Sequence, residues 1–289
     1  MDLIEDRLYH EITNLSDIIA EYDAFLFDIW GVLHEGGELY PGIVELVNKI
    51  ASKKIVRIIS NAPRLRTTTA KNLIDKGLHI NYEDMFTSGE TARHMLRESN
   101  KYFGIDNPVI YHVGQDRNLE IMSDLEHMKT QNIEEADIVL LTAFRDRDED
   151  HTPIIELLEK AASFNKLVLC ANPDLDVLHL GDVRFCAGYF AAHYVKLGGK
   201  VIQTGKPEKI IYEQCFESFE SAGKKMLMIG DTFHTDIEGA HHVAIDSGLV
   251  LTGNMGRLIT KSGITEKLEA TNNICAKQHY QPTFILNMA

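Results

Sequence analysis

Eight short apolar runs recur along this chain of 289 residues, and the segments between them are mostly long enough to form helices. The runs cover residues 24–30, 54–60, 108–113, 136–143, 166–171, 200–205, 225–231 and 248–253. Continuous apolar runs of this length suit strands buried on both faces, and helical crossovers join such strands in parallel. The sequence therefore predicts an α/β fold with a parallel sheet. Helices are predicted over residues 42–53, 64–76, 88–98, 152–164, 207–221 and 232–241.

The formal net charge of −14 bears on which partners the chain can bind. Nucleic acids and anionic membranes are held by positive fields, so we expect neither as a partner. Binding of a small anion would require a metal ion, a few basic side chains or backbone amides at the binding site. The length and the 44% hydrophobic content favour two domains with a substantial core.

Residues 1–19 are acidic and amphipathic and lack the apolar segment of a secretory signal. No apolar stretch approaches the roughly 20 residues that a membrane-spanning helix needs. The four cysteines form no CxxC pair and are predicted to be reduced; they are Cys170, Cys186, Cys215 and Cys275. These features together predict a cytoplasmic protein.

Polar side chains stand at or just after the ends of four predicted strands, where open α/β sheets place their ligand sites. They are Asp28, Ser60 with Asn61, Lys206, and the pair Asp231 and Asp236. Each has an ordinary structural interpretation when taken alone, as a turn carboxylate, a helix start, a solvated lysine or a helix cap. Their joint order along the chain instead predicts one site for phosphoryl transfer.

The residue types at these positions supply what phosphoryl transfer requires. Attack by a carboxylate such as Asp28 gives an aspartyl-phosphate and divides one difficult displacement into two easier ones. Mg²⁺ held by Asp28 and Asp231 would bring the nucleophile and the phosphate together, while Lys206 and Ser60 hold the remaining oxygens. Asp236, five positions beyond Asp231, would orient Lys206.

Four segments, in order FLFDIWGVL, IISNAPR, QTGKPEKIIYE and MIGDTFHTDIEGA, resemble the motifs of the haloacid dehalogenase (HAD) superfamily. The resemblance covers residues 22–253 and implies Mg²⁺ as the cofactor, a Rossmann-like core and hydrolysis of phosphate esters. Residues 60, 61 and 206 match the phosphate-binding positions of the family.

The long segment between the second and third motifs resembles the C2 cap of the class IIA subgroup, which includes NagD-like and pyridoxal-phosphatase-like enzymes. FTSGETA, ANPDLD and FCAGYFAAHYVKLGGK carry this part of the resemblance. It implies a core of residues 1–83 plus 200–289 and a cap of residues 84–199. It also implies a small phosphorylated substrate of the sugar phosphate, nucleotide or pyridoxal phosphate type, and association of copies through their caps.

Trp30 departs from the family pattern, which usually has a second Asp two residues after the nucleophile to donate a proton to the leaving group. The main-chain carbonyl of Trp30 can still bind the metal, but its side chain cannot transfer a proton. A positioned acid or base contributes typically 10²- to 10⁴-fold. Three interpretations follow: His34 or Glu35 replaces the acid, the leaving group is a good one or stacks on the indole, or turnover is slow or lost.

The sequence alone leaves two rival functions open. A haloacid dehalogenase also uses an aspartate nucleophile without a second acid, but it needs no metal, whereas Asp231 and Asp236 form a magnesium-type pair. A protein that binds phosphate compounds without turnover would retain the same phosphate-binding residues.

Overall fold

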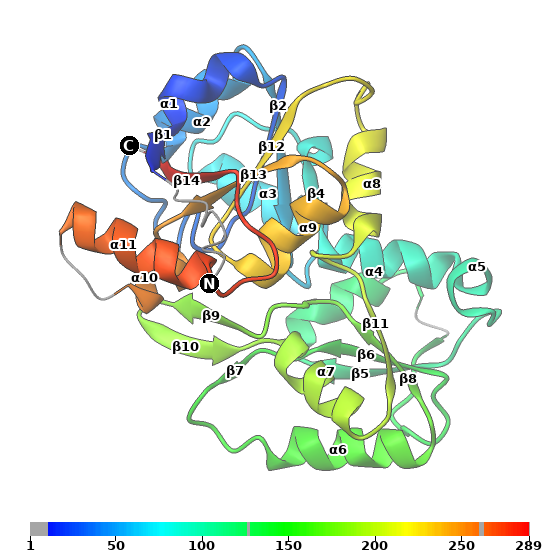
Figure 1. The fold of residues 1–289 in the computed structure, drawn as a ribbon. Coiled ribbons are helices and arrows are strands. Elements are labelled where there is room, and N and C mark those ends of the chain that lie inside the picture. Colours follow the sequence, from blue (N-terminus) through cyan, green and yellow to red (C-terminus); the bar gives the residue numbers. More distant parts are fainter. Residues whose placement is uncertain (1–10, 126–127, 260–262, 289) are drawn as a thin grey trace, which may run out of the picture.

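Seven parallel strands form the larger of the sheets, in the order β1-β14-β13-β12-β2-β3-β4 (Figure 1). They are β1 (Ile12–Asn14), β14 (Phe284–Asn287), β13 (Asp246–Val250), β12 (Met226–Gly230), β2 (Ala24–Phe27), β3 (Ile55–Ser60) and β4 (Met85–Thr87). The computed structural model describes residues 11–125, 128–259 and 263–288. Residues 1–10, part of the predicted non-secretory N-terminus, lie outside this range.

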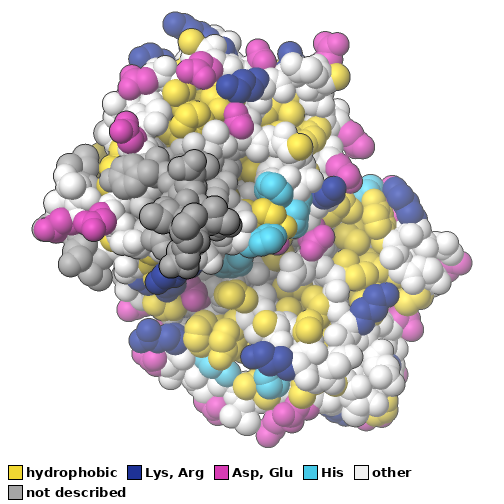
Figure 2. All heavy atoms as spheres, viewed as in Figure 1, with side chains coloured by type: hydrophobic (Ala, Val, Ile, Leu, Met, Phe, Trp, Pro, Cys, Tyr) yellow, Lys and Arg dark blue, Asp and Glu magenta, His cyan; other side chains and the backbone are white. Residues whose placement is uncertain are grey.

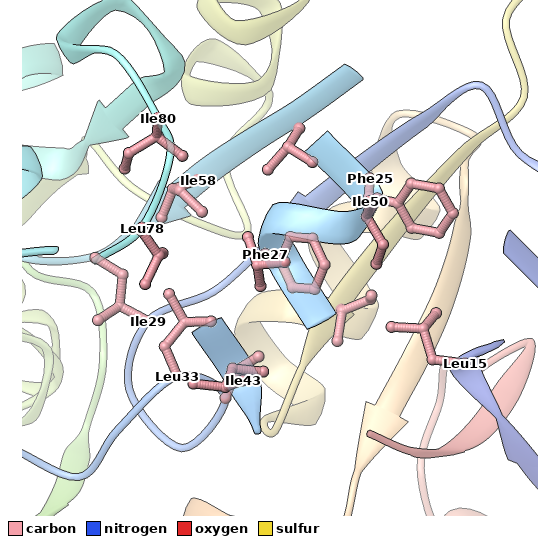
Figure 3. Close-up of a cluster of buried hydrophobic side chains, with 14 of the residues drawn as sticks. Leu15, Phe25, Phe27, Ile29, Leu33, Ile43, Ile50, Ile58, Leu78 and Ile80 are labelled. Carbon is pink, nitrogen blue, oxygen red and sulfur yellow. The ribbon is translucent and has the colours of Figure 1, made fainter. Parts of the chain in front are cut away.

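Helices flank this sheet and connect its strands. They are α1 (Leu15–Ile18), α2 (Ile43–Ala51), α3 (Arg66–Asp75), α8 (Lys209–Glu217), α9 (Glu238–His242), α10 (Gly253–Leu258) and α11 (Ile264–Cys275), with short turns η1 (Ile19–Glu21), η2 (Tyr82–Asp84) and η5 (Phe233–Ile237). Helix α2 buries Ile43, Val47 and Ile50 on one face, at the spacing that aligns helical side chains. These residues join Phe27 in a hydrophobic cluster (Figure 3). Burial of each such side chain contributes roughly 1.5–3 kcal/mol, and the packing fixes the end of β2, where Asp28 begins the next loop.

A second lobe contains two smaller sheets (Figure 1). A parallel sheet has the order β11 (Lys200–Gln203), β8 (Leu167–Cys170), β6 (Ile138–Thr142) and β5 (Ile110–Gly114). An antiparallel sheet has the order β7 (Arg145–Asp146), β10 (Asp182–Phe185) and β9 (Asp176–His179). The helices of this lobe are α4 (Ser88–Arg97), α5 (Ser99–Phe103), η3 (Asp116–Met122), α6 (Thr152–Ser163) and α7 (Ala187–Lys196).

Apolar side chains cover both faces of the four-stranded sheet, because successive residues of a strand point in opposite directions. Val139 and Leu141 of β6 pack in one cluster with α6 and α7. Ile138 and Leu140 pack in another with α4 and η3. The second lobe therefore has hydrophobic clusters of its own.

Strand pairing does not match the domain boundaries expected from the sequence. Residues 85–87, expected in the cap, form β4 and pair with β3 of the large sheet. Residues 200–203, expected in the core, form β11 and pair with β8 of the smaller sheet. We therefore propose a core of residues 11–87 plus 204–288 and a cap of residues 88–203, within the described part of the chain.

The prediction of an α/β fold with a parallel sheet is confirmed, and each predicted apolar run contains or overlaps a strand. All four cysteines are buried free thiols. Among the described residues, every helix is too short or too polar to cross a membrane.

Candidate active site

The adjacent strands β12, β2 and β3 end at the same edge of the large sheet, because they run in parallel. Asp231, Asp28 and Ser60 stand at these three ends, and all three are buried. Lys206 reaches the same place from the loop after β11 and is only 1% exposed. The order of the strands thus brings together residues that lie far apart in the sequence.

Lys206 forms two buried ion pairs at the centre of this cluster. Its Nζ lies 2.6 Å from Asp28 Oδ1 and 2.7 Å from Asp236 Oδ1. The other oxygen of Asp236 accepts hydrogen bonds from the backbone N–H groups of Asp231 and Thr232. Asp236 therefore contacts Lys206 and the loop after β12 at once, in the position that the sequence predicts for orienting the lysine.

Three carboxylates lie within reach of one cation, those of Asp28, Asp231 and Asp236. One oxygen of each lies within 4.8 Å of the other two. Oxygen ligands of this kind suit Mg²⁺. Gly31 has a φ of +76°, and a Cβ there would lie 2.1 Å from Asp231 Oδ2. The loop after β2 can approach the carboxylate this closely because residue 31 has no side chain. The residues present therefore fit a divalent cation.

The electrostatics of the cluster also favour an added cation. Burial raises the pKa of Asp28 well above its ordinary value; Lys206 opposes this shift, and Asp236 and Asp231 add to it. Burial and the charge of Asp236 raise the pKa of Asp231 to about 7. For Lys206, burial lowers the pKa, but the carboxylates of Asp236 and Asp28 outweigh it and leave the pKa raised. One lysine does not neutralise three buried carboxylates, and a divalent ion would.

The side chain of Asn61, a predicted phosphate-binding residue, is paired within the protein. Its amide nitrogen donates to Asp174 Oδ1 at 2.8 Å and to the Lys206 carbonyl at 3.1 Å, and its oxygen accepts from the Lys206 N–H at 2.8 Å. Both amide hydrogens are thus engaged with the protein, so this side chain holds the lysine loop and the cap instead of presenting the amide to phosphate. Ser60 Oγ accepts from the Ala62 N–H at 3.2 Å, and its hydroxyl hydrogen can still be donated.

A cavity of about 280 Å³ lies beside this cluster, between the core and the cap. The core contributes residues next to the predicted catalytic positions, among them Trp30 and Ala62, and the cap contributes Phe144, Asp174 and His179. The indole of Trp30 lies 5.5 Å from the ring of His179, measured between ring centroids. The residue that replaces the usual acid is therefore part of the cavity wall.

His34 and Glu35 are the two residues considered as replacements for the missing acid, and they differ in whether they line the cavity. His34 lines the cavity; its Nδ1 accepts from the Gly36 N–H, and burial, with Lys76 and His179, lowers its pKa to about 4. At neutral pH it is therefore an uncharged imidazole. Glu35 does not line the cavity, and its Oε1 accepts from the Tyr40 hydroxyl and, at 3.1 Å, from the Gly253 N–H.

Asp174 is the carboxyl group that the cavity wall does contain, and it was not singled out from the sequence. It follows β8 in the segment ANPDLD, at the end of a strand of the cap. The same strand-end rule that identified Asp28 would have found it if it had been applied to the cap. Burial raises the pKa of Asp174, with Lys206 and the hydrogen bond from Asn61 opposing the shift.

Two sequence families match the chain: haloacid dehalogenase-like hydrolases over residues 25–128 and HAD-hydrolase-like proteins over residues 203–287. Among curated proteins, phosphoglycolate phosphatase 1A of Arabidopsis thaliana is 24% identical, over 84% of this chain and 72% of its own length. Chronophin of Rattus norvegicus is 26% identical, over 83% of this chain and 79% of its own.

A solved haloacid dehalogenase-like hydrolase from Brucella suis superposes with a TM-score of 0.74 and 26% identity. The superposition covers 89% of this chain and 96% of that one. The motif order, the fold, the sequence families and the solved structure agree, and the chain belongs to the HAD-like hydrolases.

Proposed function

We propose that the protein is a Mg²⁺-dependent phosphatase that hydrolyses a small phosphorylated metabolite through an aspartyl-phosphate on Asp28. The observation that carries the proposal is the pairing of Lys206 with both Asp28 and Asp236 beside the third carboxylate of Asp231. The names of the relatives agree, since they include phosphoglycolate phosphatase and a 5'-nucleotidase of Bacillus subtilis.

In the first step a carboxylate oxygen of Asp28 attacks phosphorus, and the bond from phosphorus to the ester oxygen breaks with its electron pair on the leaving group. In the second step water attacks the same phosphorus, which frees inorganic phosphate and restores the carboxylate. Lys206 and Ser60 bind phosphate oxygens in both steps. Mg²⁺ bound by Asp28, Asp231 and the Trp30 carbonyl would neutralise phosphate charge. Asp236 keeps Lys206 in place.

Trp30 determines which esters react fastest. A leaving group that needs a proton finds no carboxyl group at position 30. Asp174 is the carboxyl group on the wall of the neighbouring cavity. We assign it the donation of that proton, and the tie to Asn61 holds it near the phosphate site. Esters with good leaving groups need no such donor and are the best substrates.

A metabolite phosphatase screen with Mg²⁺ tests this function. Wild-type protein should release phosphate from at least one metabolite, and both EDTA and the change Asp28→Asn should abolish the release. Activity on a 2-haloacid that survives EDTA would instead support a dehalogenase. Calorimetric binding of phosphate compounds without any product over hours would support a non-catalytic binding protein.

We further propose that the protein acts in the cytoplasm, without a nucleic-acid or membrane partner, and that copies associate through their caps. On the face shown in Figure 2, Lys and Arg side chains lie scattered among acidic and neutral ones and form no broad basic surface. Helix α7 presents apolar side chains to solvent, with Val195 56% exposed and Tyr189 40% exposed.

A further inference from the structure

Arg117 differs from the other arginines of the cap. Each of the others in the described cap contacts a carboxylate; they are Arg93, Arg97, Arg145, Arg147 and Arg184. Arg117 lines the cavity beside the catalytic cluster, and its guanidinium lies 5.8 Å from the centre of the Phe144 ring. It contacts no carboxylate among the residues that the structure describes. The chain has 43 acidic residues and 29 basic ones, yet no carboxylate among the described residues pairs with Arg117 at the cavity.

A second guanidinium lies near the first. Arg64 also lines the cavity, and its Nε lies 2.5 Å from Glu120 Oε1, so its charge is balanced within the protein. Burial and the positive charge of Arg64 both lower the pKa of Arg117. An anion bound at Arg117 would relieve both effects, and arginine pairs with carboxylates and phosphates through two parallel hydrogen bonds.

Asn118 supplies an independent observation on the same wall. Its side chain is 1% exposed, and its nitrogen donates to the Thr142 carbonyl at 3.2 Å. Its oxygen is buried and accepts no hydrogen bond from any described residue. A buried acceptor without a donor is unfavourable, and such groups are normally satisfied by water or by a ligand. Since Asn118 lines the cavity, a bound molecule can provide the donor.

We propose that this cavity is a second anion site, in which Arg117 binds a carboxylate or a second phosphate on the leaving group of the ester. Asn118 accepts a hydrogen bond from a hydroxyl or amine of the same leaving group. The aromatic side chains of Trp30 and Phe144 contact its apolar part. The inference rests on the proposed function and narrows it to phosphate esters whose leaving group is itself anionic.

Matched aryl phosphates test the proposal. The probes are 4-carboxyphenyl phosphate, its neutral amide 4-carbamoylphenyl phosphate, and 1,4-phenylene bisphosphate. We expect kcat/KM of the wild-type protein to favour an anionic probe over the amide by about 10- to 100-fold. Arg117→Gln should remove this preference, Arg117→Lys should restore part of it, and Arg147→Gln, an exposed cap arginine, should leave it unchanged. Comparing the carboxylate with the bisphosphate decides which anion is bound.

Binding to the Asp28→Asn protein, measured by calorimetry with the same probes and Mg²⁺, separates this inference from the proposed function. If the wild-type protein hydrolyses none of the probes but binding still favours the anionic ones through Arg117, the anion site stands and the phosphatase proposal fails. Hydrolysis of all three without a preference overturns the anion site alone. A preference that survives Arg117→Gln, or no binding of any probe, also overturns it.

Discussion

The carboxylate and lysine cluster, called here the phosphate end, and the cavity beside it, called the leaving-group end, differ in how completely their polar groups are paired. At the phosphate end, hydrogen bonds and ion pairs join Lys206 to Asn61, Asp236 and Asp28. At the leaving-group end, within the described part of the chain, Arg117 contacts no carboxylate and the Asn118 oxygen accepts no hydrogen bond. We infer that the protein builds the phosphate site in advance and that the substrate provides the missing partners in the cavity.

The largest effect is expected at the phosphate end from Lys206→Met. The change leaves buried carboxylates without their cation, so kcat/KM should fall by more than about 10³-fold. The free energy of unfolding without Mg²⁺ should fall by about 3–5 kcal/mol. Steady-state kinetics and urea denaturation measure both. Lys209→Met, an exposed position on α8, is the matched control, and similar losses in that variant would contradict the special place of Lys206.

Changes at Trp30 and Asp174 should act on the leaving-group end. Wild-type protein should hydrolyse acetyl phosphate and p-nitrophenyl phosphate faster than glycerol phosphate, because the latter has a poor leaving group. Trp30→Asp should raise the rate on glycerol phosphate by about 10²-fold. Asp174→Asn should lower that rate by roughly tenfold or more while changing the rate on p-nitrophenyl phosphate less. Equal wild-type rates on all three esters would show that the leaving group does not limit turnover.

The response to pH should distinguish the carboxylates of the phosphate end. Burial raises the pKa of Asp231 to about 7, so between about pH 4 and 7 the metal-free folded protein holds a proton that the unfolded chain releases. The contribution of Asp231 to the stability of the metal-free protein therefore falls as the pH rises through this window. Mg²⁺ binds more readily at the higher pH, because it no longer has to displace the proton. We expect the rise in Tm caused by Mg²⁺ to be larger at pH 8 than at pH 5.5, by at least about 3 °C.

The rise in Tm caused by Mg²⁺, and not Tm itself, is the quantity to compare, because other groups also change Tm with pH. Burial lowers the pKa values of His34 and His112 to about 4, so these residues oppose stability as the pH falls below 6.5. Subtracting the metal-free Tm at each pH removes much of that contribution. Asp231→Asn should reduce the pH dependence of this rise in Tm, and an equal rise at both pH values in the wild-type protein would argue against Asp231 as a ligand.

The smallest effect is expected from Glu35→Gln. Its carboxylate bonds to Tyr40 and Gly253 and does not face the cavity, so the rates on glycerol phosphate and p-nitrophenyl phosphate should stay within about threefold of the wild-type values. A selective loss on glycerol phosphate would restore Glu35 as the missing acid and remove that role from Asp174.

The sequence predicted the phosphate end better than the leaving-group end for a physical reason. Asp28, Ser60 and Asp231 end parallel strands of one sheet, so strand order alone brings them together. The cavity is built from segments of different lobes, and their contact depends on how the cap packs against the core. Arg117 comes from a 3₁₀ helix of the cap, and no periodic pattern of its own indicates that it lines the same cavity as Trp30.

The same reasoning explains why we propose other domain boundaries than the sequence suggested, and why some strands were missed. Strand β4 has three residues, too few for a visible apolar run, and β11 continues directly into the Lys206 loop. Strands β9 and β10 each have two polar residues among four, and Leu180 and Gly181 between them both have positive φ. Short and half-polar strands of this kind are stabilised by their neighbours and leave little trace in the sequence.

The most direct test of the account is to detect phosphate on Asp28 during turnover. Wild-type protein mixed with Mg²⁺ and p-nitrophenyl phosphate is quenched in acid within the first turnovers, reduced with borohydride and analysed by peptide mass spectrometry. An aspartyl-phosphate at residue 28 would be converted to homoserine in the peptide that contains FLFDIWGVL, and Asp28→Asn protein would show no such conversion. Steady release of p-nitrophenol with an unmodified Asp28 peptide would contradict the account.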